Sequence, residues 1–209
     1  MGESTHRSLT VRLFAATVGA VDSERTLTPS AFPDDDGQAS AGIRAALAEA
    51  STSRTPASYL RAVTALCLDR VLVPVVATAT RMGATTSGPG LQSRVSDKEA
   101  EMSVVLLQTG DGRRAMLAFT GLDALQSWSA EARPVPVTLD LAAQSAVADQ
   151  ATALLVDFAG PHPLVIEGEV LAELALGHRL VELDDGGFGW AVAADPFPPL
   201  GSKPAVGLE

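Results

Sequence analysis

Apolar residues recur at helical spacing in two early stretches of the chain. Residues 41–50 (AGIRAALAEA) are rich in Ala and Leu, which favour helix, and Ser40 stands where a hydroxyl can cap the first free amides. Residues 57–69 (ASYLRAVTALCLD) repeat the pattern and predict a second helix. Residues 70–79 (RVLVPVVATA) form a continuous Val-rich run that predicts a buried strand, with Pro74 at a bulge or an edge because proline cannot donate to a sheet ladder.

A β-hairpin is predicted in the middle of the chain. Residues 102–109 (MSVVLLQT) and 114–120 (RAMLAFT) are strand-like, and the Asp111-Gly112 pair between them is a typical hairpin turn. A helix-like segment, residues 121–129 (GLDALQSWS), follows at once.

The junction between that hairpin and the helix invites two interpretations. Thr120 is followed three residues later by Asp123, which resembles a capping box with a shorter acid. We therefore expect Thr120 to bind the free amides of the helix and Asp123 to complement its positive end. The alternative is that these amides bind an anion.

The second half of the chain alternates between strands and helices. The prolines of residues 132–140 (ARPVPVTLD) predict an exposed edge strand or an extended link, and Asp140 is placed to cap the next helix. The remaining predicted elements are a helix at 141–151, strands at 152–160 and 163–168, a helix at 169–177 closed by Gly177, and a hairpin at 180–193.

This order of elements predicts an α+β (mixed α/β) fold, with helices packed on a mixed β-sheet that has a central antiparallel hairpin. The predicted organisation is an N-terminal arm (1–38), a central domain (39–180) and a C-terminal hairpin with a Pro-rich acidic tail (181–209). The Gly-rich segment 80–101 predicts a long loop, and the apolar run 13–21 reads as a strand or as a weak signal segment.

Charge and cysteine content narrow the function classes. The 209 residues carry a net charge of −10, and residues 167–209 hold eight acids against two bases. Nucleic acids and anionic membranes need a basic face, so neither is an expected partner. The single cysteine, Cys67, lies among apolar residues and predicts a buried, inert thiol in a cytoplasmic protein.

No catalytic residue, cofactor site or metal site is predicted. The three histidines, His6, His162 and His178, lack metal-ligand spacing, and we expect His178 to cap the carbonyls of the helix before it. The acids of residues 34–37 (DDDG) are consecutive, unlike those of a calcium loop, and predict a solvated turn. Nucleophile-elbow, Walker and dinucleotide-binding motifs are absent from the sequence.

The candidate interaction surface combines Arg and Trp, which are typical interface anchors, with a proline-rich strand. Its members are Arg113, Arg114, Trp128, Arg133, Pro134 and Pro136. The competing interpretation makes the Trp a core residue and the arginines ordinary surface. An edge strand can also receive a partner strand, or pair with its own copy to form a homo-oligomer.

A small-molecule or enzyme site is the alternative hypothesis, and it uses Thr120 and Asp157. Asp157 ends a predicted strand, where α/β proteins often keep functional acids, although an Asp in this position more often caps a turn. The hypothesis requires both residues to line one concave pocket.

Four segments follow one another along the chain: 72–77 (LVPVVA), 101–128 (EMSVVLLQTGDGRRAMLAFTGLDALQSW), 132–137 (ARPVPV) and 153–161 (ALLVDFAGP). Together, in this order, they resemble the SseB-like N-terminal domain proteins of actinobacteria, and the likeness covers roughly residues 25–180. The resemblance implies the fold, and it offers no catalytic motif to transfer. Some relatives have a second, C-terminal SseB domain, which we do not expect here. We therefore expect a non-enzymatic, cytoplasmic protein-interaction or regulatory module with an unidentified protein partner.

Overall fold

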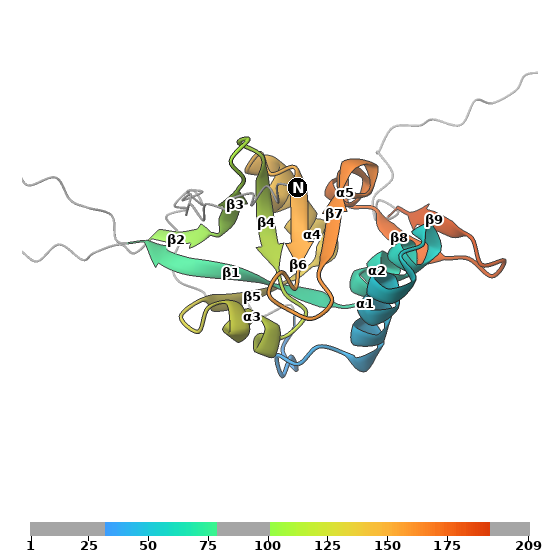
Figure 1. The fold of residues 1–209 in the computed structure, drawn as a ribbon, viewed down its shortest axis with the longest axis horizontal. Helices are drawn as coiled ribbons and strands as arrows, with labels where there is room; N and C mark the ends of the chain where they lie inside the picture. Colours follow the sequence, from blue (N-terminus) through green and yellow to red (C-terminus); the bar gives the residue numbers. More distant parts are fainter. Residues whose placement is uncertain (1–31, 79–100, 193–209) are drawn as a thin grey trace, which may run out of the picture.

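The computed structural model describes residues 32–78 and 101–192 (Figure 1). The predicted strand or signal segment at 13–21, nearly all of the loop at 80–101 and the Pro-rich tail lie outside these residues. Within them, no helix is both long and apolar enough to cross a bilayer.

The described strands form two sheets and a separate hairpin. The strands are β1 (Arg70–Thr78), β2 (Glu101–Val104), β3 (Leu106–Gln108), β4 (Arg114–Ala118), β5 (Arg133–Thr138), β6 (Ala153–Val156), β7 (Leu164–Glu167), β8 (Arg179–Glu182) and β9 (Phe188–Ala191). One sheet has the order β2-β1-β5, the second has the order β3-β4-β6-β7, and β8 pairs with β9. Since β4 and β6 are parallel and the other pairs antiparallel, the second sheet is mixed. The predicted α+β class and the central hairpin, here β3–β4, are confirmed.

Five helices lie among the described residues. They are α1 (Ala41–Ser53), α2 (Pro56–Cys67), α3 (Leu122–Trp128), α4 (Leu139–Ala148) and α5 (Gly168–Ala175). The two N-terminal helices pack side by side at one end of the molecule, α3 lies near β1 and β5, and α4 packs on α5 (Figure 1). Ser40 caps α1 as predicted, by accepting a hydrogen bond from the N–H of Ile43.

The predicted cap of α4 is wrong. Thr138 is the N-cap residue, and its side chain makes no capping bond. Asp140 lies in the first turn, where its charge complements the helix dipole, and it forms an ion pair with Arg179 at 3.4 Å. The helix therefore begins two residues earlier than the sequence pattern indicated.

The single strand predicted at 102–109 is two strands, which meet at Val105. The β1–β2 register, extended by one residue, would place Pro74 opposite Val105. Leu72 exchanges two backbone hydrogen bonds with Phe119, at 2.7 and 2.9 Å. Backbone groups two residues apart in a strand point to the same side, so the backbone of Pro74 also points to the side of β1 away from β5, where it has no N–H to donate. The ladder consequently ends there, and the chain turns into β3 of the other sheet. Pro74 thus lies in the middle strand of its sheet, and the predicted edge position is wrong.

Two apolar clusters fill the interior. The larger joins α1, α2, α4 and α5 to the strands and includes Cys67, whose pKa is raised by burial, as expected for an inert core thiol. The smaller cluster lies beneath α3, where the ring of Trp128 packs 5.7 Å from that of Phe119. The scarcity of aromatic residues leaves Ala, Val and Leu to provide most of both clusters.

A buried glycine fixes how the chain enters α1. Gly37 has a φ of +78°, and its carbonyl accepts a hydrogen bond from the N–H of Leu122 at 2.8 Å. A Cβ at this position would lie 2.3 Å from Cδ1 of Leu122. Position 37 therefore needs glycine for both its backbone conformation and its close contact with α3.

We expect Gly37→Ala to destabilise the fold by about 2 kcal/mol, because it combines a strained φ with an overpacked contact. Gly42→Ala is the matched control, since a Cβ there meets nothing within 4 Å. Urea unfolding of both variants measures the difference, and equal stabilities would contradict the role given to Gly37.

Candidate functional site

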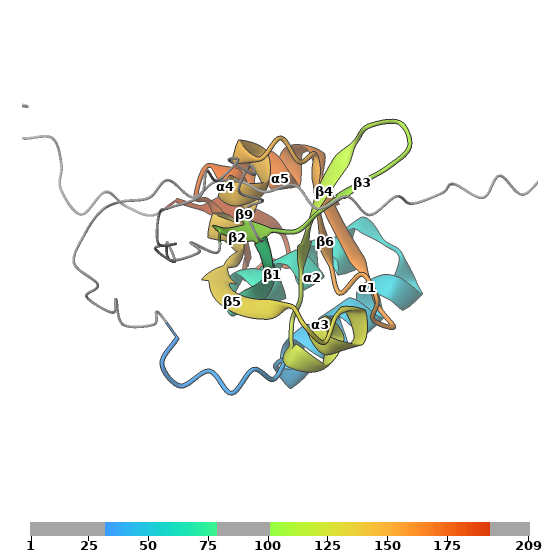
Figure 2. The same cartoon turned by 90° about the vertical axis from the view of Figure 1, so that its left-hand side faces the viewer.

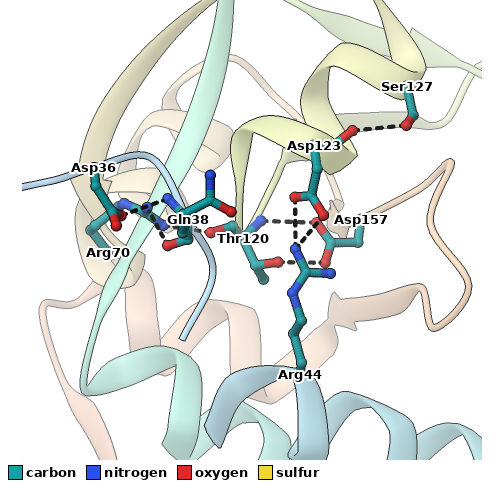
Figure 3. A network of polar contacts seen from close by, with 8 residues as sticks. All are labelled: Asp36, Gln38, Arg44, Arg70, Thr120, Asp123, Ser127 and Asp157. Atoms are coloured by element: carbon teal, nitrogen blue, oxygen red, sulfur yellow. Dashed lines mark hydrogen bonds and ion pairs between the residues drawn. The ribbon is translucent and has the colours of Figure 1, made fainter. Parts of the chain in front are cut away.

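The structure brings Thr120 and Asp157 together. Because β4 and β6 are parallel, the residues that follow them meet at the same edge of the sheet. Asp157 accepts two hydrogen bonds from Thr120: the backbone N–H binds Oδ1 at 2.8 Å and the hydroxyl binds Oδ2 at 2.7 Å (Figure 3). Thr120 is fully buried and Asp157 is 5% exposed. The pair joins the ends of the two strands.

The predicted capping role of Thr120 is wrong. The N-cap residue of α3 is Gly121, and it makes no side-chain capping bond. The hydroxyl and the N–H of Thr120 are both directed to the Asp157 carboxylate, which is the stronger, charged acceptor. Asp123 does lie in the first turn of α3, as predicted.

Opposing effects act on the Asp157 carboxyl. Burial raises its pKa above the ordinary value, while the Thr120 hydrogen bonds and the positive charge of Arg44 act to lower it, and burial prevails. The guanidinium of Arg44 contacts both carboxylate oxygens of Asp123 at 2.6 Å (Figure 3), and its charge also acts on Asp157. A carboxyl with a raised pKa beside a hydroxyl is the feature that most resembles a reactive group here.

Arg70, at the start of β1, is the central polar residue that sequence analysis missed. Its side chain is 3% exposed and forms an ion pair with Asp35, with contacts of 2.7 and 2.9 Å. It also donates to the carbonyls of Gln38, at 2.8 Å, and Thr120 (Figure 3). The hydrogen bond from Arg70 is the main cause of a lowered Asp35 pKa.

The interpretation of residues 34–37 as a solvated turn is wrong for Asp35. Although its backbone is accessible, the Asp35 side chain is only 15% exposed because it binds Arg70. A useful signal was present in the sequence: Arg70 opens a run that reads as fully buried, and a buried arginine requires an acidic partner.

A hollow of about 570 Å³ lies beside this ion pair. Its lining consists of Phe32, Pro33, Asp34, Asp35, Asp36, Gln38, Ala39, Ser40, Asp69 and Arg70. The alternative ligand-site hypothesis placed Thr120 and Asp157 in one pocket, and neither residue lines this hollow. Within residues 32–78 and 101–192, no three His, Cys, Asp or Glu side chains are grouped as metal ligands.

His178 does not cap helix carbonyls with its side chain as predicted. Its Nδ1 lies 2.7 Å from Oε2 of Glu173 in α5, so the imidazole binds a carboxylate and not a helix carbonyl. The backbone N–H of His178 binds the Glu173 carbonyl instead.

The predicted interaction residues fall into two separate groups. Arg113 and Arg114 lie at the tip of the β3–β4 hairpin, which projects away from α3 and β5 in both views (Figures 1 and 2). There Arg113 forms an ion pair with Asp111 at 3.1 Å, and Arg114 donates to Gln150 at 3.4 Å. These two arginines and the β5 residues therefore do not form one surface.

The second group lies on β5 and the end of α3. Arg133 and Pro134 are exposed, Pro136 is partly exposed, and Trp128 is partly buried against the smaller core cluster. Trp128 therefore contributes to the core as well as to the surface.

Comparison with protein families gives a match to the family model described as the SseB protein N-terminal domain, over residues 43–173. The matched region is more than half of the chain and contains every strand from β1 to β7. Comparisons with curated proteins and with solved structures give no match.

Asp157 and Asp35 should affect stability with opposite pH dependence. The raised pKa of Asp157 means that the folded protein binds this proton more tightly than the unfolded chain does. The contribution of Asp157 to stability is present below pH 3.8, the ordinary pKa of an aspartate, and is lost as pH rises through the raised pKa. The lowered pKa of Asp35 gives a contribution that is present above 3.8 and is lost as pH falls.

Unfolding free energies of wild type, Asp157→Asn and Asp35→Asn from about pH 2 to 7 test this difference, because the Asp35 contribution changes below pH 3.8 and the Asp157 contribution changes above it. The stability advantage of wild type over Asp157→Asn should shrink as pH rises, whereas its advantage over Asp35→Asn should grow. Parallel profiles for the two variants would contradict the assignment.

Arg70→Met should destabilise the protein by about 3 kcal/mol, because the largely covered Asp35 carboxylate loses its cation and keeps only the hydrogen bond from the Gly37 N–H, and two carbonyls lose a donor. Arg44→Met is the matched control, because its ion pair with Asp123 is exposed, at 41% and 56% for the two side chains, and should contribute about 1 kcal/mol or less. Urea denaturation of both variants gives the comparison. Similar losses would show that Arg70 has no special role.

Proposed function

From the premise that the chain belongs to the SseB N-terminal domain family, we propose that it is a non-enzymatic docking module that binds another protein through β5. The contact region, here called the β5 surface, consists of Arg133, Pro134, Val135, Pro136 and Trp128. The observation that carries the proposal is that, among residues 32–78 and 101–192, no strand pairs with the outer edge of β5, which presents exposed side chains and lacks backbone donors at its prolines.

The backbone directions follow from the register. Since Leu72 turns its N–H and C=O toward Phe119, its neighbours Val71 and Val73 turn theirs toward β5. Val73 is opposite Val135, and Leu72 is opposite Pro136. The backbone N–H and C=O groups of Val135 and Val137 therefore point toward β1. The backbone of Pro134 and Pro136 points outward, where it offers carbonyls and no N–H.

Such an edge is poorly suited to strand addition. A strand added there would find no donor at either proline, which is a way that proteins protect an exposed edge. The structure thus gives little support to homo-oligomerisation through β5, and it favours recognition by side chains. An acidic and apolar partner surface would match Arg133 and Val135, which is 37% exposed.

The two arginines at the β3–β4 tip do not belong to this proposal. They are separated from the β5 surface by the length of β4, about 17 Å for a five-residue strand. Arg113, which is exposed, therefore serves as a control position for charge reversal.

A small-molecule or enzyme site near Thr120 and Asp157 is the second candidate: the raised pKa of a carboxyl at the ends of parallel strands supports it, and the position of both residues outside the hollow counts against it. A thermal-shift screen of metabolites tests it. A metabolite that stabilises wild type but not Asp157→Asn would favour this candidate, and it would count against a purely docking role.

We further propose that the protein works in the cytoplasm of an actinobacterial cell. Its single thiol is buried and unpaired, which suits a reducing compartment. The chain has thirteen Arg and two Lys, which suits a GC-rich genome.

Replacing Arg133 by Glu and Val135 by Asp together should abolish partner binding and leave the fold intact, because both side chains are exposed and the new acids repel an acidic partner. The measurement is affinity capture from the native lysate, with the melting temperature recorded for each variant.

Arg113→Glu is the matched control and should capture the same partner as wild type. Retention of that partner by the folded β5 double variant would overturn the choice of surface.

A further inference from the structure

The C-terminal hairpin, β8–β9, is a separate unit resting on the helices. It forms its own two-stranded sheet, lies outside the matched region 43–173, and packs beside α2 at the end of the molecule away from β2 (Figure 1). An isolated two-stranded hairpin is marginally stable in water, so this one depends on the helices for its structure.

One buried side chain anchors the hairpin. Leu180 is 3% exposed and belongs to the larger core cluster, and its backbone acts to lower the pKa of the Cys67 thiol of α2, against the larger effect of burial. Its cross-strand neighbour Trp190 and the nearby Phe188 pack against the same cluster while remaining partly exposed. Without Leu180 in place, an apolar area of α2 would be open to water.

Two ion pairs flank this anchor. On one side Arg179 lies 3.4 Å from Asp140 of α4. On the other side Glu182 lies 3.5 Å from Arg61 of α2, which also binds Glu49 of α1. The Arg61–Glu182 pair and Arg179 are substantially exposed, so each ion pair contributes little stability but sets orientation.

The connection to the rest of the domain is short. Gly177, with a φ of +84°, stands between α5 and β8, and the hairpin has no ladder pairing with the two main sheets in residues 32–78 and 101–192. Undocking would therefore break the core contacts of Leu180, Trp190 and Phe188 and the exposed ion pairs, without breaking a ladder hydrogen bond of either main sheet.

We infer that the apolar surface beneath the hairpin is a docking site that β8 occupies in its own chain, and that it accepts a partner strand with the same order of side chains. That order is a basic residue, a large apolar residue, any residue and an acidic residue, as in Arg179-Leu180-Val181-Glu182. The charges determine which residues the partner strand needs. Asp140 requires a cation on one side of the apolar anchor, and Arg61 requires an anion on the other side. The inference is independent of the β5 surface.

A fluorescent peptide of residues 178–192, added to the full-length protein, is the probe. Leu180→Ala in the protein weakens the internal competitor and leaves the docking surface unchanged, so peptide affinity should rise at least about tenfold over wild type. Leu183→Ala is the matched control, because Leu183 is 47% exposed in the turn, and it should leave the affinity at the wild-type level.

A second peptide with Arg179→Glu and Glu182→Arg should bind the Leu180→Ala protein more weakly, because both charges are then reversed. Equal binding of the probe to the Leu180→Ala and Leu183→Ala proteins would overturn the inference.

If Leu180→Ala does not fold, hydrogen exchange of the wild-type protein tests whether the hairpin undocks while the rest of the domain stays folded. Amides of β8 and β9 should open with a lower free energy than those of β6. Exchange of both only through global unfolding would overturn the inference, and because no external partner is involved, neither result bears on the β5 surface.

Discussion

The buried ion pair between Arg70 and Asp35 is the constraint on which the arrangement of the polar end of the molecule depends. A guanidinium that is 3% exposed needs all of its donors satisfied, and here it binds one carboxylate and two carbonyls. These acceptors come from the segment before α1 and from the residue that follows β4. One side chain at the start of β1 therefore fixes the entry to α1 and the exit from β4, and Thr120, so held, is in place to bind Asp157.

Proline positions determine the limits of the first sheet, β2-β1-β5. Pro74 lacks a donor where β2 would continue, so the chain leaves that ladder at Val105 and forms the projecting β3–β4 hairpin. Pro134 and Pro136 face outward from β5 and limit pairing on the other side. The prolines therefore fall where no ladder hydrogen bond is required, and each one also ends or blocks a possible extension of the sheet.

The sequence was sufficient for features that depend on local pattern, and insufficient for those that depend on distant partners. Helix periodicity, the Ser40 cap, the Asp111-Gly112 turn and the edge position of β5 could all be predicted. The role of Thr120 could not, because a threonine before a helix is a good cap unless a carboxylate 37 residues away offers a stronger acceptor. Asp35 was misread for the same reason: its partner, Arg70, is 35 residues distant.

The two proposed docking surfaces differ in how a partner would gain access. The β5 surface is exposed in the folded protein, so its affinity is set by its own contacts. The surface beneath β8 is occupied, and a partner's apparent affinity is reduced by the fraction of molecules in which the hairpin is undocked. Because exposed ion pairs contribute little, that fraction depends mainly on the burial of Leu180 and on the packing of Trp190 and Phe188, so apolar contacts of the hairpin decide whether the second surface is available.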